Sequence, residues 1–208
     1  EKDSQFGGSF RYASLAPKKE SLGKFLDYLI NQVKKTNTAI QFNKEATAES
    51  IKQFSADVVV LAHGARNVPV EINGTQNNGV LNVKDAFTTA ESIGNNVAIA
   101  GGGPEGCELA DFLIAGGKKV TLIEMRRVFG LGLVAHPRYH VCERLKKMGA
   151  QLYVNTKVSE IGRDYIVISR RREADQKLEG FTTIVIPTLH QPNGALAASV
   201  KSFVPDVY

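Results

Sequence analysis

The chain has 208 residues, of which 43% are hydrophobic and 23% charged, the composition of an ordinary soluble globular protein with one or two small domains. Its apolar runs are too short for a transmembrane helix, and its two cysteines can neither build a disulfide framework nor hold an iron–sulfur cluster alone. We therefore expect a cytoplasmic protein that does not bind membranes. The net charge of +5 is spread along the chain, which favours anionic ligands such as nucleotides and does not predict a nucleic-acid partner.

Both ends of the chain suggest a piece of a longer polypeptide. It opens with Glu1 rather than Met, and it stops in the apolar, strand-like stretch 204–208. Native termini are usually polar. We therefore expect the remainder of the same polypeptide to be a partner of this chain.

The first part of the chain mixes helical and strand patterns. Residues 22–35 carry apolar side chains at helical spacing and end in two lysines, which predicts a helix with its C-terminus there. A strand is predicted over 39–42. Residues 48–54 predict a short helix with Thr47 as N-cap and with Ser50 too weak to complete a capping box.

A continuous β-branched run at 57–62 is typical of a strand buried on both faces. Residues 63–69 are expected to turn out of this strand. The stretch 71–95 is rich in loop signals, and a short helix is predicted within it at 85–93.

The clearest unit covers residues 96–124. A short apolar strand at 96–100 runs into a glycine-rich turn at 101–106, a helix follows at 107–115, and a second strand is predicted at 119–124. A strand, a helix and a strand within about 30 residues form a βαβ unit, which requires a right-handed crossover and a parallel sheet.

The rest of the chain continues in the α/β pattern. A helix is predicted at 136–148, and strands are predicted at 151–155, 165–169 and 182–186. A hairpin turn is expected at 170–173.

The glycine-rich turn fits G-x-G-x-x-G, the pattern that binds a dinucleotide. Gly101 permits the tight turn, Gly103 lets a pyrophosphate approach the backbone, and Gly106 lets the helix pack closely on the strand. The pyrophosphate is then held at the helix N-terminus by free N–H groups and the helix dipole. The candidate cofactor-binding residues of this loop are Gly101, Gly102, Gly103, Pro104, Glu105 and Gly106.

Glu124 ends the second strand, 18 residues after Gly106, where a carboxylate accepts a hydrogen bond from the ribose. Such a carboxylate binds a free 2′-hydroxyl and repels a 2′-phosphate, so NAD(H) is expected rather than NADP(H). Arg126 and Arg127 follow and can either pair with a phosphate or remain solvated. Met125 and Arg126 complete the candidate site at this strand end.

The other reactive side chains have weaker patterns. Glu108 either belongs to the start of the helix or points toward the nicotinamide. Cys107 and Cys142 are interpreted as packing residues. Histidines 136 and 140 lie four residues apart on one helix face, but no third ligand is evident, so no metal site is expected. No catalytic residue is assigned.

With these residues in view, the chain resembles the C-terminal half of the NADH:flavin oxidoreductases related to old yellow enzyme. This group contains bacterial 2,4-dienoyl-CoA reductase, enoate reductases and trimethylamine dehydrogenase. The resemblance covers nearly the whole chain, and it rests on Gly7-Gly8 and on the motifs at 16–20, 57–65, 101–108 and 117–125.

The resemblance implies an α/β fold in which a Rossmann-like NAD(P)-binding domain is inserted into a truncated FAD-binding domain, as in flavoproteins with two dinucleotide-binding domains. Residues 1–83 and 190–208 would form the truncated FAD-binding domain. Residues 84–189 would form the NAD(P)H-binding domain.

The resemblance also supplies candidate FAD contacts. Glu1 and Lys2 resemble the ribose-binding end of a strand, and His63 and Gly64 lie in a turn near the flavin. His63 replaces the usual Thr, and neutral packing is favoured over a flavin contact for it.

A second turn differs from the family pattern. Residues 187–193 stand where the family usually has A-x-G-x-x-P-N. Pro187 and Leu189 would stiffen and fill a place where Gly normally lets the cofactor approach.

By resemblance, the whole enzyme would carry a barrel domain with FMN and an iron–sulfur cluster, neither of which belongs to this chain. Electrons would pass from NADH to FAD, then to the cluster, FMN and an activated alkene. This chain alone would be inactive and would bind FAD weakly or not at all, and an oligomer is possible. Two alternatives stay open, namely a disulfide reductase-type fragment and a non-catalytic nucleotide-binding or regulatory module.

Overall fold

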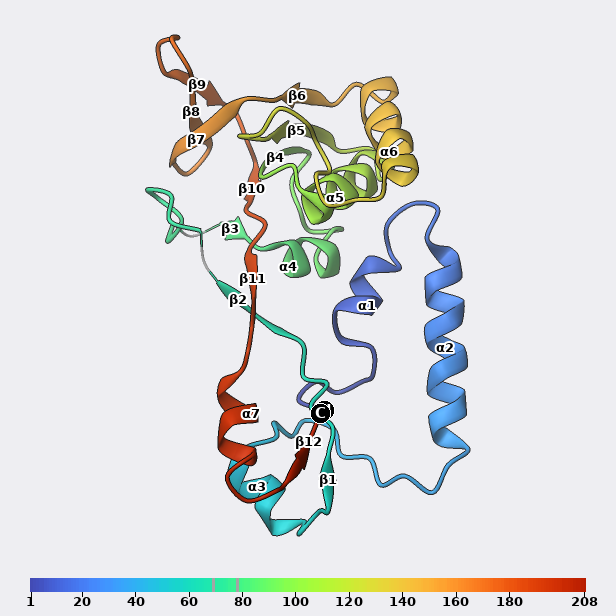
Figure 1. Cartoon of the computed structure of the whole chain (residues 1–208). Coiled ribbons are helices and arrows are strands. Elements are labelled where there is room, and N and C mark those ends of the chain that lie inside the picture. The colour runs from blue at the N-terminus through green and yellow to red at the C-terminus, as the bar shows by residue number, and fades with distance from the viewer. Residues whose placement is uncertain (69, 78) are drawn as a thin grey trace. The chain divides into compact units, whose positions relative to one another are not determined.

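The computed structural model describes residues 1–68, 70–77 and 79–208 (Figure 1). Residues 69 and 78 lie outside the described residues. Residue 69 ends the turn expected at 63–69, and residue 78 belongs to the expected loop 71–95. The chain divides into two compact units. Unit 1 contains residues 1–8, 27–69 and 189–208, and unit 2 contains residues 9–26 and 70–188. Among the described residues, no helix is both long and apolar enough to cross a membrane.

Unit 2 is built on a parallel sheet of five strands in the order β3-β10-β4-β5-β6. The strands are β3 (Val80–Leu81), β4 (Asn96–Ala100), β5 (Lys119–Ile123), β6 (Gln151–Tyr153) and β10 (Thr183–Val185). Strands β4 and β5 pair over their whole length and are joined by helix α5 (Pro104–Ala115). The α/β fold class and the predicted βαβ unit are thereby confirmed.

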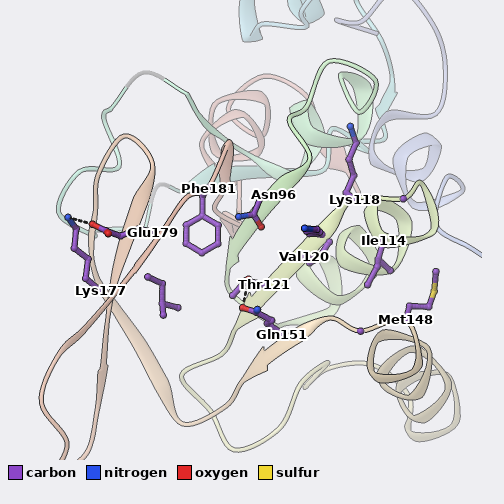
Figure 2. A pocket seen from close by; sticks show the side chains of 14 residues that line it. Asn96, Ile114, Lys118, Val120, Thr121, Met148, Gln151, Lys177, Glu179 and Phe181 are labelled. Atoms are coloured by element: carbon purple, nitrogen blue, oxygen red, sulfur yellow. Dashed lines mark hydrogen bonds and ion pairs between the residues drawn. The ribbon is translucent and has the colours of Figure 1, made fainter.

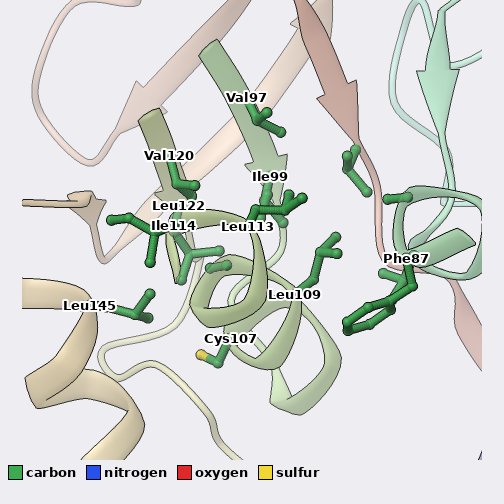
Figure 3. Packing of buried hydrophobic residues seen from close by; sticks show 14 of the residues in the cluster. Phe87, Val97, Ile99, Cys107, Leu109, Leu113, Ile114, Val120, Leu122 and Leu145 are labelled. Carbon is green, nitrogen blue, oxygen red and sulfur yellow. The ribbon is translucent and has the colours of Figure 1, made fainter. Parts of the chain in front are cut away.

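Apolar side chains of α5 pack on the sheet and form the main core of unit 2. Figure 3 shows Leu109 and Leu113 of α5 against Val97 and Ile99 of β4, and all four are fully or almost fully buried. Helix α6 (Ala135–Lys147) adds Leu145 to the same cluster. The sheet and α5 therefore form a rigid base beneath the loop that connects β4 to α5.

Helix α4 (Val83–Thr88) lies earlier in the chain than predicted. The side chain of Asn82 accepts a hydrogen bond from Asp85 N–H at 2.9 Å, which caps the first turn. The helix ends at Thr88 and turns follow it, so the predicted helix over 85–93 is wrong at both ends.

A three-stranded antiparallel sheet completes unit 2. It consists of β7 (Thr156–Ile161), β8 (Tyr165–Arg170) and β9 (Gln176–Glu179). Its inner side chains pack with residues of β4, β5 and β10 in a second buried cluster. Sequence patterns predicted only β8 and the turn after it. Arg172 occupies that turn with a φ of 66°, in the left-handed region that tight turns require.

Unit 1 contains two small pairs of strands. Strand β1 (Val58–Val59) pairs in parallel with β12 (Asp206–Val207), and β2 (Ala65–Val68) pairs antiparallel with β11 (Leu189–Pro192). The turns expected at 63–69 and 187–193 therefore contain strands, because the two segments pair with each other.

Two strand predictions in unit 1 are wrong in detail. The predicted buried strand 57–62 shrinks to two residues, and Val58 and Val60 are exposed, because β1 pairs with β12 alone among the described strands. Residues 39–42 form no strand, although the carbonyl of Gln41 accepts a hydrogen bond from the amino group of Glu1 at 3.0 Å.

The remaining helices are α1 (Gly8–Ala13), α2 (Glu20–Lys34), α3 (Ala48–Gln53) and α7 (Ala195–Val200). Helices α2 and α3 confirm the predictions for 22–35 and 48–54. The Thr47 cap is also confirmed, but the capping box is complete: Thr47 N–H donates to Ser50 Oγ at 2.9 Å, and Ser50 N–H donates to Thr47 Oγ1 at 3.1 Å. A hydroxyl at this position is a sufficient acceptor, so the expectation for Ser50 was wrong.

Candidate dinucleotide-binding site

The glycine loop connects the carboxyl end of β4 to the first turn of α5, and its tight path depends on two glycines. Gly101 has a φ of 147°, which disfavours other residues. A Cβ on Gly106 would lie 1.8 Å from the carbonyl oxygen of Gly101, so only glycine permits this close approach of helix and strand. Both roles agree with the tasks predicted for these positions.

Gly103 is the N-cap of α5 and faces open space. A Cβ built on it meets no atom within 4 Å, and its φ of −68° permits any residue. Pro104 takes the first helical position, where its missing N–H costs nothing, and Glu105 follows in the first turn. The loop therefore leaves room beside the backbone at the N-terminus of a twelve-residue helix.

Gly102 is buried in the loop, and it is joined to the end of β5. Its N–H donates to Glu124 Oε2 at 2.9 Å, and its carbonyl accepts from Gly130 N–H at 2.7 Å. A Cβ on Gly102 would lie 2.4 Å from Cδ1 of Phe129, whose ring covers this point of the loop. The segment that follows β5 therefore packs directly on the glycine loop.

The carboxylate of Glu124 is held at this junction with only 8% of the residue exposed. Its second oxygen, Oε1, accepts a hydrogen bond from Arg126 N–H at 2.8 Å. The structure thus brings the predicted ribose carboxylate to the glycine loop. Met125 and the side chain of Arg126 are exposed to solvent beside it.

An ion pair that sequence patterns did not predict lies one turn into α5. Lys19 donates to Glu108 across 89 residues of sequence, and both side chains are partly buried. Lys19 belongs to the 16–20 motif on which the resemblance rests, but nothing in the sequence pairs it with Glu108. The pair places one cation and one anion beside the glycine loop.

Both cysteines behave as packing residues. Cys107 is fully buried on α5 (Figure 3), and burial raises the pKa of its thiol to about 12. Cys142 is partly buried against the same core, and burial also raises the pKa of its thiol. Neither thiol therefore has the lowered pKa of a reactive cysteine.

Pro187 lies at the carboxyl end of β10 and contacts the glycine loop. Its ring atoms Cγ and Cδ lie 3.2 Å from a Cβ built on Gly101, and its Cγ lies 3.4 Å from one built on Gly106. A stiff ring thus fills the place beside the loop, as expected for this departure from the family pattern. Leu189 is also expected to fill a place near the cofactor, but its side chain lies outside the described part of the structure.

The candidate FAD residues belong to unit 1. Glu1, Lys2, His63 and Gly64 are exposed, and Gly64 has a φ of 71°. Glu1 uses its side chain to accept a hydrogen bond from Asp3 N–H at 2.9 Å. The packing expected for His63 is not formed in this chain.

A separate hollow of about 830 Å³ lies in unit 2 (Figure 2), and no residue of the glycine loop lines it. Its lining includes Asn96, Lys119 and Gln151, which begin β4, β5 and β6. The hollow therefore lies at the amino ends of the strands, whereas the glycine loop and Glu124 lie at the carboxyl ends. Ligands of open parallel sheets bind at the carboxyl ends.

Most of the chain is similar to known oxidoreductases. The family model described as pyridine nucleotide-disulphide oxidoreductase matches residues 5–195. A bilirubin reductase of Mediterraneibacter gnavus (strain CC55_001C) is 30% identical over 161 residues, which cover 77% of this chain and 25% of that protein. An NADH oxidase of Thermoanaerobacter brockii is 30% identical over 165 residues, with the same coverage of 77% and 25%.

A solved structure of 2-naphthoyl-CoA reductase with 2-naphthoyl-CoA matches with a TM-score of 0.90 at 26% identity, over 100% of this chain and 31% of that one. The chain thus spans about a quarter to a third of the length of these relatives. From the family match over residues 5–195, the chain belongs to the pyridine nucleotide-disulphide oxidoreductase family.

Proposed function

We propose that the β4–α5–β5 unit holds NADH and positions it to reduce an FAD within a larger flavin-dependent oxidoreductase. Membership of the family implies FAD and NAD(P)H as ligands. The assignment of the nucleotide to this unit rests on one observation. The Glu124 carboxylate accepts a hydrogen bond of 2.9 Å from the N–H of Gly102 in the glycine loop, next to Gly103, which faces open space.

The residues of the loop fit a dinucleotide. The space beside Gly103 would admit a pyrophosphate, and the N-terminus of α5 favours its negative charge. Glu124 has one hydrogen bond to each oxygen, which leaves further acceptor capacity for ribose hydroxyls. Met125 and Arg126 would flank the adenosine half of the nucleotide.

When bound, NADH supplies a hydride, and the protein contributes binding and orientation. We assign residues 84–189 to the NAD(P)H-binding domain, and residues 1–83 and 190–208 to part of an FAD-binding domain. Glu1, Lys2, His63 and Gly64 would contact the FAD. This assignment rests on the resemblance and on the family match.

In the complete protein, we infer that electrons continue from FAD through an iron–sulfur cluster and FMN to an activated alkene. The relatives named as a bilirubin reductase and a 2-naphthoyl-CoA reductase support a reduced organic acceptor, and the NADH oxidase supports NADH as the donor. A disulfide reductase is less well supported. Both cysteines of this chain have thiol pKa values raised by burial, so a redox-active cysteine pair would have to lie elsewhere in the complete protein.

The assignment is tested by NADH titration of this chain, followed by calorimetry or nucleotide fluorescence, with Gly103→Ala as the informative variant. The added methyl group meets no protein atom within 4 Å, so the variant is expected to fold normally. It would occupy the space assigned to the pyrophosphate, and we expect NADH affinity to fall by about tenfold or more, equivalent to about 1.4 kcal/mol.

Glu91→Gln is the matched control, because Glu91 is exposed in unit 2 in the turn before the amino end of β4. It is expected to bind NADH like the unmodified chain. Equal NADH affinity in Gly103→Ala and the unmodified chain would contradict the assignment. Failure of the unmodified chain to bind NADH would contradict a self-sufficient site.

A further inference from the structure

We propose that His136 and His140 form a two-nitrogen chelate for a divalent first-row transition-metal ion. The two residues lie one turn apart on α6, and their Nε2 atoms share a hydrogen bond of 3.2 Å, which a bound ion would replace. Their rings meet edge to face, with centroids 4.5 Å apart. This pair has no part in the proposed nucleotide site, so the inference is independent of it.

The distance between the two nitrogens suits a shared ion. A Zn²⁺–N bond is about 2.0–2.1 Å long, so two nitrogens on one ion at angles of about 90–110° lie about 2.9–3.4 Å apart. The observed 3.2 Å falls within this range. An ion could therefore bridge both imidazoles without a change in the helix backbone.

The position of the pair leaves room for the rest of a coordination shell. Both histidines are exposed, so water can fill the remaining positions. In the described part of the chain, no three or more His, Cys, Asp or Glu side chains are grouped as a metal cluster. The sequence predicts no metal site because no third ligand is evident, but an open chelate needs only two protein ligands.

The donor set selects the class of ion. Two neutral imidazoles suit Cu²⁺, Ni²⁺ and Zn²⁺, whereas Mg²⁺ and Ca²⁺ prefer oxygen ligands. Among the first group, affinity is expected to be highest for Cu²⁺. An ion bound across one helical turn also favours the helical state of α6, since the unfolded segment does not hold the two rings together.

The test uses the full chain without a histidine tag, titrated with NiCl₂ and CuCl₂ by calorimetry. We expect one ion per chain at this site, with affinity at least about tenfold weaker in His136→Gln and in His140→Gln, since even indirect ligand partners contribute that much. His63→Gln is the matched control, because His63 is also exposed but lies in unit 1. Its affinity for Ni²⁺ should be unchanged.

Two further readouts separate the chelate from adventitious binding. The Cu²⁺ complex should show two coordinated nitrogens by electron paramagnetic resonance, and Ni²⁺ should raise the melting temperature of the unmodified chain but not of either α6 variant. Circular dichroism without metal checks that all variants fold. The proposal is overturned if no ion binds, or if either α6 variant binds Ni²⁺ as tightly as the unmodified chain.

Discussion

The carboxylate of Glu124 and the backbone N–H of Gly102 are joined by a buried hydrogen bond of 2.9 Å across 22 residues of sequence. A second hydrogen bond from Arg126 N–H fixes the other carboxylate oxygen, and the ring of Phe129 covers the loop at Gly102. The carboxylate is therefore oriented by the protein itself. A ligand that uses it does not have to order the side chain on binding, which favours affinity.

Gly106→Ala is expected to destabilise unit 2 strongly. The new Cβ would lie 1.8 Å from the carbonyl oxygen of Gly101, which belongs to the backbone and cannot rotate away. We expect the free energy of unfolding to fall by about 3 kcal/mol or more, the upper range for overpacked sites. Urea unfolding followed by circular dichroism measures it.

Gly103→Ala, a substitution in the same loop, is the variant with which Gly106→Ala is compared. Its Cβ meets nothing within 4 Å, and only the preference for glycine over alanine at an N-cap is lost, at a cost of about 1 kcal/mol or less. Equal losses in the two variants would show that close packing of α5 on β4 does not depend on position 106.

Arg144→Met tests the ion pair that joins α6 to α5. Arg144 donates to both carboxylate oxygens of Asp111 at 2.5–3.1 Å, and Asp111 is only 1% exposed. Removing the guanidinium leaves a buried carboxylate without its cation, which should cost about 3 kcal/mol in the free energy of unfolding. Denaturant titration at neutral pH measures this loss.

The exposed ion pair between Glu143 and Lys146 on the same helix serves as its control. Glu143→Gln should change the free energy of unfolding by less than about 0.5 kcal/mol, because solvent screens this pair. If Arg144→Met cost no more than Glu143→Gln, the pair with Asp111 would contribute nothing to stability.

Cys107 should make the chain less stable at alkaline pH. Burial raises the pKa of its thiol from 9.0 to about 12, so between these values the unfolded chain loses a proton that the folded chain keeps. Stability is therefore fully retained below pH 9 and falls as the pH rises toward 12. The loss is on the order of 1 kcal/mol at pH 10.

Urea midpoints between pH 7 and pH 10.5 measure this effect against Cys107→Ala. The variant has no thiol at this position, so its stability should fall less steeply above pH 9, although its value at pH 7 is lower because a cavity replaces the sulfur. Parallel pH profiles for the two proteins would contradict the assignment to Cys107.

The sequence predicted the β4–α5–β5 unit well because its determinants are local. Apolar runs, the glycines and the distance from Gly106 to Glu124 all lie within 29 residues, and the structure assigns β4 over the predicted residues. The contact between Gly102 and Glu124 also follows from this topology, since the carboxyl ends of neighbouring parallel strands lie together.

Features that depend on distant partners could not be predicted in the same way. Strands β2 and β11 lie where the sequence patterns predict turns, because each strand is short and gains its hydrogen bonds from a segment more than a hundred residues away. The partner of Glu108 is Lys19, 89 residues earlier. By contrast, residues 57–62 were expected to form a strand buried on both faces, and this prediction was wrong. Within the described residues, the strand pairs with a neighbour on one side only.

Glu124→Gln is expected to shift nucleotide preference from NADH toward NADPH. A carboxylate at this position repels a 2′-phosphate, and two unit charges about 4 Å apart near a protein surface interact by about 4 kcal/mol. Part of this repulsion suffices for a tenfold change, so we expect the ratio of NADH to NADPH affinity to fall by at least about tenfold. Parallel titrations with the two nucleotides measure the ratio.

The side-chain amide introduced by Glu124→Gln keeps an acceptor for one of the two backbone donors, Gly102 and Arg126, so a modest loss of stability is expected and is monitored by thermal unfolding. A general loss of folding would lower both affinities together and leave their ratio unchanged. A ratio that moves only in Glu124→Gln, and not in Glu91→Gln, therefore identifies the charge of this carboxylate as the determinant. An unchanged ratio in a folded variant would mean that Glu124 supports the glycine loop but does not select the nucleotide.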